Sequence, residues 1–116
     1  MEFPVLSEEK GKYMKDEIVK HLKEAFGLGE DEIADIYQSY VSAYYKEVEV
    51  MPKLLAAGNF ADLKRSAHTL KGCALNCGDS VAADAAISLQ SSATSEDSAA
   101  CAETISKLKE IFETLT

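Results

Sequence analysis

The segment from residue 67 to residue 72, Ala-His-Thr-Leu-Lys-Gly, holds the side chains of this chain that are best suited to chemistry. On a helix of about 100° per residue, one face collects six residues: Lys64, Arg65, His68, Lys71, Gly72 and Leu75. A neutral imidazole is a competent nucleophile near pH 7 and can hold a phosphoryl group as a phosphoramidate. A lysine one turn away can neutralise phosphoryl oxygens. The spacing is therefore suited to phosphoryl transfer at an exposed histidine.

Gly72 is unfavourable in the middle of a helix, because a glycine there costs about 1 kcal/mol of helix stability relative to alanine. Such a violation is typical of a functional site or of a close approach by another backbone. Here it removes side-chain bulk beside His68, and Leu75 extends the same face with an apolar contact. We expect Lys64, Arg65, Gly72 and Leu75 to form a face on which a partner docks. From the residues alone, an ordinary solvated helix face without a docking function is an equally good interpretation.

The apolar residues recur at steps of three and four along the whole chain, which predicts an all-α protein. Helices are expected at about 8–26, from 31 onward, at 60–77, at 80–92 and after the polar loop 94–97. Because most connections are short, the last four helices should form an antiparallel up-and-down bundle. We expect residues 1–29 to supply a tail and a lid helix, and 30–116 the bundle, within a single structural domain.

Capping residues and helix breakers set the expected helix ends. Ser7 is a suitable N-cap for the first helix, and Gly78 suits the turn after the third helix. Pro52 should kink the second helix or split off its last turn, because it lacks a backbone donor. His21 is expected on the polar edge of the first helix as a solvated residue.

Composition excludes several classes of function. A net charge of −8 argues against nucleic acid or an anionic membrane as partner. The longest apolar runs are shorter than the roughly 20 residues of a membrane span, and the start lacks a signal peptide, so a cytoplasmic location is expected. Cys73, Cys77 and Cys101 are expected to be reduced thiols. No metal site is expected. The sequence has no glycine-rich nucleotide-binding loop, so ATP binding is not expected either.

The motif around His68 resembles the signature of histidine-containing phosphotransfer (HPt) domains. It matches A-H-x-L-K-G, with a second glycine, Gly78, six residues after the first. The similarity covers about residues 30 to 115: Asn59 stands where the family has a Gly-Asp-like turn, and Tyr40 matches an aromatic position. Gln90 replaces a common glutamate, a difference expected at the surface.

This resemblance implies a role for each residue of the motif. His68 would accept the phosphoryl group, Lys71 would stabilise it, Gly72 would leave room for the partner, and Gly78 would serve a turn. Some relatives place a glutamine on the preceding helix to bond the imidazole. Its place here is taken by Ala43, so Ser42 or Tyr44 is the expected substitute.

The resemblance also implies a function and its partners. The chain would carry phosphate between the aspartates of two receiver domains, or to and from a hybrid sensor kinase, without kinase activity of its own. Any Mg²⁺ would come with the receiver, and the carrier itself is expected to be a monomer. The alternative is a non-phosphorylated adaptor that docks on a kinase or receiver and blocks it. An adaptor has no need for the histidine, so His68, Lys71 and Gly72 together favour the carrier.

Overall fold

A computed structural model describes the backbone of residues 3–116 and the side chains of residues 15–116. The described chain forms five helices and contains no strand, so the all-α prediction is confirmed. The helices are α1 (Phe3–Phe26), α2 (Glu30–Ala56), α3 (Phe60–Cys77), α4 (Ser80–Thr94) and α5 (Ser98–Leu115).

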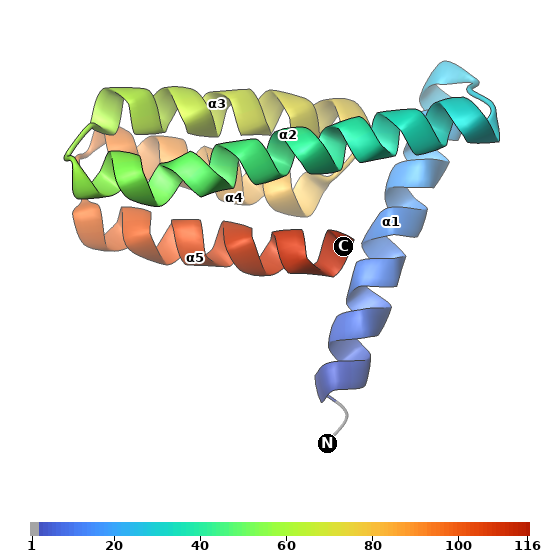
Figure 1. Cartoon of the computed structure of the whole chain (residues 1–116), viewed down its shortest axis with the longest axis horizontal. Coiled ribbons are helices and arrows are strands. Elements are labelled where there is room, and N and C mark those ends of the chain that lie inside the picture. The colour runs from blue at the N-terminus through green and yellow to red at the C-terminus, as the bar shows by residue number, and fades with distance from the viewer. Residues whose placement is uncertain (1–2) are drawn as a thin grey trace.

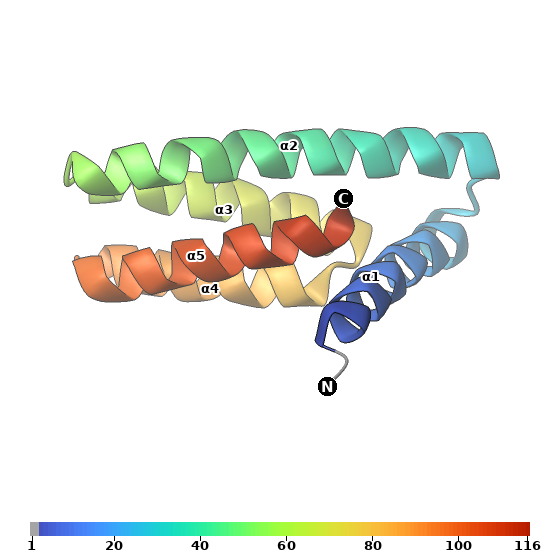
Figure 2. The ribbon, with the colours of Figure 1, turned by 60° about the horizontal axis from the view of Figure 1, so that its bottom comes forward.

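Helices α2 to α5 run alternately up and down and form the expected bundle (Figure 1). Each of them packs against the next in the chain, and α5 closes the bundle against α2. Helix α1 crosses one end of the bundle and contacts α5, α2 and α3, as Figure 2 shows from a second side. The lid arrangement expected for the first helix is therefore confirmed.

Two expected helix ends are wrong. Helix α1 begins at Phe3 and continues through Ser7, which is therefore not its N-cap. Pro4 falls in the first turn, where a missing backbone donor costs nothing, so the helix can include it. Helix α2 continues through Pro52 to Ala56 without the expected split, and its ribbon shows no sharp bend (Figure 2). The neighbouring Met51 is fully buried, and this packing holds the last turns in place.

Tyrosines of α2 tie the bundle together from inside. The hydroxyl of Tyr44 donates to the carbonyl of Leu108 at 2.7 Å, and that of Tyr37 donates to the carbonyl of Leu115 at the same distance. Both acceptors belong to α5. A buried phenol needs a partner for its hydroxyl, so these bonds let large aromatic rings fill the core. They fix α2 against α5.

The turn between α3 and α4 is fixed by polar contacts in the core. Gly78 ends α3 in the left-handed region at φ 76°, as its place after the third helix predicts. The fully buried Asp79 then caps α4 by accepting a bond from the backbone N–H of Ala82. Its other carboxylate oxygen accepts from the hydroxyl of Tyr40 at 2.7 Å. Helix α2 thereby holds the start of α4.

Candidate functional site

Helix α3 presents His68 to solvent, as the helical pattern predicts. The helix begins after Asn59, whose side chain accepts from the backbone N–H of Asp62, and it ends at Gly78. Ala67 and Leu70 on either side of His68 are fully buried, whereas the histidine itself is exposed. The rigid helix therefore carries the imidazole at the surface of the bundle.

The partner of the imidazole comes from α4 and not from α2. Nε2 of Gln90 lies 3.3 Å from Nδ1 of His68. The expectation of a surface position for Gln90 is therefore incomplete, because its amide contacts the candidate nucleophile. The expected substitutes on α2 are wrong. Tyr44 is buried and its hydroxyl is bonded to α5, and Ser42 is not among the bonding partners of His68 in the described residues.

The three basic residues of the face differ in their surroundings. Arg65 donates to Asp62 at 2.7 Å, in the only ion pair that residues 15–116 contain. Lys71, one turn after His68, is half-buried, and Lys64 is exposed. The charges of Lys64 and Lys71 are thus not neutralised by an ion pair, and both remain available to an anionic group.

Gly72 faces open space. A Cβ built on this residue would meet no atom within 4 Å, so no neighbouring element of the fold requires a glycine here. Leu75, one turn further along α3, is 54% exposed. The structure therefore brings His68, Lys64, Lys71, Gly72 and Leu75 to one surface.

Two hydrogen bonds to α2 hold α3 and its following turn in place around His68. Ser66 points into the bundle, and its hydroxyl donates to a carboxylate oxygen of Glu47 on α2 at 2.7 Å. On the other side, the bond between Tyr40 and Asp79 anchors the turn into α4. Burial and the charge of Asp79 raise the pKa of the Tyr40 hydroxyl, so it stays a donor. These contacts fix the position of α4 relative to α3, and therefore the position of Gln90 relative to His68.

His21 is not simply solvated, which corrects the expectation for this residue. It is half-buried, and its ring packs edge-on against Phe26, with 6.1 Å between the ring centroids. A Cβ on Gly78 would stand only 2.5 Å from Cγ of His21. Gly78 is thus required twice, by its positive φ and by the contact with α1.

The described residues contain no group of three or more potential metal ligands, and Cys73, Cys77 and Cys101 are free thiols. Burial, followed by the neighbouring Cys73, raises the pKa of Cys77 to about 11. Within the described residues, no helix has the length and apolar character needed to cross a bilayer.

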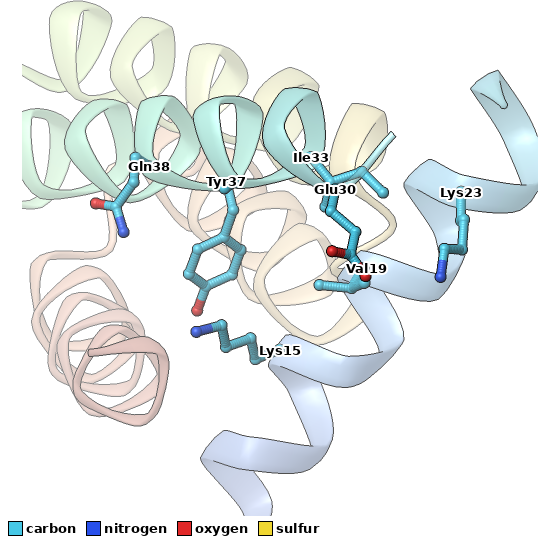
Figure 3. Close-up of a pocket in the computed structure, with 8 residues that line it drawn as sticks. Lys15, Val19, Lys23, Glu30, Ile33, Tyr37 and Gln38 are labelled. Carbon is cyan, nitrogen blue, oxygen red and sulfur yellow. The ribbon is translucent and has the colours of Figure 1, made fainter. Parts of the chain in front are cut away.

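A cleft of about 210 Å³ opens between α1 and α2 (Figure 3). Its lining consists of Lys15, Val19, Lys23, Glu30, Ile33, Ala34, Tyr37 and Gln38. The ammonium of Lys15 lies 5.3 Å from the centroid of the Tyr37 ring. None of the lining residues belongs to α3 or α4, so the cleft is separate from the surface around His68.

Comparison with known proteins agrees with this geometry. A family model described as the Hpt domain matches residues 31–116, a range that includes all of α3, α4 and α5 and nearly all of α2. Comparisons with curated proteins and with solved structures gave no match.

Proposed function

The chain belongs to the Hpt domain family, and we propose that it is a phosphorelay intermediate that uses His68 as its phosphoryl acceptor. Members of this family carry phosphoryl groups in two-component signalling and are not kinases. In the proposed relay, His68 takes the group from the aspartate of one receiver domain and gives it to that of another. The observation that supports this most is an exposed imidazole that α4 contacts through one nitrogen only.

The contact with Gln90 suggests which nitrogen reacts. Because Nδ1 of His68 is occupied by the amide, Nε2 is the nitrogen free to attack phosphorus. Attack needs the lone pair of Nε2, so the ring proton must then be on Nδ1. An amide rotated by 180° presents its oxygen to Nδ1–H, whereas the amide nitrogen donates to Nδ1 when that position carries no proton. Gln90 can therefore serve both tautomers of the imidazole.

The transfer itself replaces one bond to phosphorus by another. The P–N bond to Nε2 forms as the P–O bond to the donor aspartate breaks, and the bonding pair of that P–O bond leaves with the carboxylate. The Nδ1 proton remains on the ring and is donated to the side-chain oxygen of Gln90 in its rotated amide. Such a reaction needs positioning and charge neutralisation more than covalent machinery. Lys71 supplies a cation one turn from the imidazole, and we expect Mg²⁺ to arrive with the receiver.

Transfer from labelled receivers tests this proposal. Each receiver domain of the source genome is phosphorylated with a small-molecule donor and mixed with the parent chain, with His68→Gln and with His21→Gln. We expect label on the parent and on His21→Gln, and none on His68→Gln. The His21 variant is the matched control, because it removes the other histidine of the sequence.

Two results would count against the proposal. Label on His68→Gln at the parental rate would move the site elsewhere. A parent chain that accepts label from no receiver, yet binds one and blocks its reactions equally well with His68→Gln, would show the adaptor instead of the carrier.

A further inference from the structure

The cleft between α1 and α2 has an apolar wall to which both helices contribute. It lies where the two helices diverge from the loop at residues 27–29 (Figure 3). Ile33 and Tyr37 of α2 line it and belong to the core, and Val19 of α1 packs against the same core from the other side. An apolar wall that the fold leaves open is a place where an apolar group of a ligand can be buried.

The charged residues of the cleft are distributed unevenly. Lys15 and Lys23 come from α1, and Glu30, which is the only acidic residue of the lining, comes from α2. None of the three takes part in an ion pair within residues 15–116. Figure 3 shows Glu30 on the side of Lys23, whereas Lys15 lies beside Tyr37. The end of the cleft at Lys15 is therefore positive, in a chain whose net charge is −8.

An aromatic ring, and not a carboxylate, positions the ammonium group of Lys15. This group lies 5.3 Å from the centroid of the Tyr37 ring. The ring is itself fixed, because its hydroxyl donates to the carbonyl of Leu115 on α5. A cation over an aromatic face keeps its N–H donors for a further partner. A carboxylate that accepts from Lys15 would thus bind beside the apolar wall.

We propose that this cleft binds a small monocarboxylate, with its carboxylate on Lys15 and its apolar body between Val19 and Ile33. The volume of 210 Å³ is below the roughly 300–1,000 Å³ of pockets for drug-sized ligands, so the ligand is small. A cationic ligand would be repelled by both lysines. One cation without an ion pair suits the single charge of a carboxylate better than the double charge of a phosphate monoester, which Glu30 would also repel.

Binding of 3-phenylpropionate to the whole ¹⁵N-labelled chain tests this proposal. The amide resonances are followed during the titration at neutral pH. Three further compounds serve as controls: 3-phenylpropanamide lacks the charge, acetate lacks the apolar body, and phenyl phosphate carries a larger charge. The measurement does not involve His68, so its outcome leaves the proposed phosphoryl transfer untouched.

Three variants locate the binding site. Lys15→Gln removes the cation of the cleft, and Lys20→Gln is the matched control, because Lys20 is also exposed on α1 but does not line the cleft. Ala34→Gln fills the cleft with a longer side chain. Ala34 is exposed on α2, so the fold should tolerate this change. Thermal melts check that each variant folds like the parent.

We expect 3-phenylpropionate to shift the resonances of Val19, Ile33 and Tyr37 saturably, with a Kd on the order of 1 mM or lower. Lys15→Gln should raise this Kd by at least about fivefold, because a charge-assisted hydrogen bond is lost. Ala34→Gln should weaken binding as well, Lys20→Gln should match the parent, and all three control compounds should bind more weakly.

Several results would overturn the proposal. One is the absence of a saturable shift at about 10 mM 3-phenylpropionate, ten times the expected Kd. Others are shifts confined to residues outside the cleft, a Lys15→Gln variant that binds as tightly as the parent, and an amide or phosphate that binds as tightly as the carboxylate.

Discussion

His68 of α3 and Gln90 of α4 meet across the seam between their helices, with 3.3 Å from Nδ1 of the imidazole to Nε2 of the amide. The two residues are 22 positions apart in the sequence. This contact leaves the other ring nitrogen for chemistry and makes α4 a part of the site. It also gives Gln90 a role that can be tested apart from folding, because the amide lies at the surface.

Replacement of Gln90 should slow transfer without weakening the fold. Gln90→Ala loses one hydrogen bond to the imidazole, which is worth about 1 kcal/mol and corresponds to about a fivefold lower rate. Gln90→Glu can only accept a bond and should favour the tautomer with its proton on Nδ1, so it should retain more activity than alanine. Single-turnover transfer rates, with melting temperatures as the folding control, check this. Alanine and glutamate variants as fast as the parent would remove the positioning role of Gln90.

Three glycines should respond differently to alanine. Gly72→Ala should raise the free energy of unfolding by about 0.5–1 kcal/mol, because the added methyl group contacts no other atom and alanine loses less backbone entropy than glycine in a helix. Gly58→Ala should lower it by about 1–2 kcal/mol, because φ is 68° although space is free. Gly78→Ala should lower it further, since its methyl group would also collide with His21.

Urea unfolding of the three variants measures these differences. The variant Gly58→Ala is the control for backbone strain alone, so its difference from Gly78→Ala reports the contact with α1. Equal losses for these two variants would contradict the packing of His21 on Gly78.

Tyr40→Phe should destabilise the bundle by about 1–3 kcal/mol, because the buried Asp79 carboxylate loses a donor. Tyr44→Phe is the matched control. It removes a hydrogen bond to the backbone carbonyl of Leu108, which is neutral. The loss in the free energy of unfolding should therefore be smaller than for Tyr40→Phe, where the acceptor is a buried carboxylate. Urea unfolding at neutral pH measures both variants, and an equal or larger loss for Tyr44→Phe would contradict the account.

Alkaline pH should weaken the fold through the same tyrosines. Burial and the charge of Asp79 raise the pKa of both Tyr40 and Tyr44 above the ordinary value of 10.0. The folded chain therefore keeps protons that the unfolded chain releases, and the free energy of unfolding should fall as the pH rises above about 10. Tyr40→Phe removes one of these groups and should make the fall less steep. A fall of unchanged slope would contradict the contribution of Tyr40.

The bundle and the exposure of His68 follow from patterns that lie within single helices. Steps of three and four place Ala67 and Leu70 inside and His68 outside, whatever the neighbouring helices do. The contact with Gln90 depends on the register between α3 and α4, which the turn at Gly78 and the bond between Tyr40 and Asp79 determine. No pattern inside α4 reports that register, so the sequence predicts only a surface position for Gln90 and points to α2 for the partner of the imidazole.

The environment of His21 could not be predicted from the sequence, because it too depends on how two distant segments pack together. A wheel of the first helix places this histidine at the edge of the apolar stripe, and the stripe does not show which element covers the edge. In the fold that element is the turn at Gly78. A signal was present, since a glycine at a helix end can serve close packing as well as a positive φ, but the sequence could not pair it with a residue 57 positions earlier.

The three thiols should react at different rates with an alkylating reagent. Cys77 and Cys101 are buried, and burial raises the pKa of both. Less thiolate and less access should slow their alkylation by at least tenfold relative to Cys73, which is half-exposed. Mass spectrometry of peptides after timed alkylation at pH 8 measures this. In urea all three should react at similar rates, and a native Cys77 as fast as Cys73 would contradict its burial.

The role proposed for His68 is tested most sharply by identifying the nitrogen that carries the phosphoryl group. The chain is labelled with ¹⁵N, phosphorylated by its receiver, and observed by long-range ¹H–¹⁵N NMR of the imidazole rings. Only two histidines are present, so the assignment needs no more than a comparison with His21→Gln. We expect phosphorus on Nε2 of His68 and an unchanged spectrum for His21. Phosphorus on Nδ1 of His68, on His21, or on no histidine would contradict it.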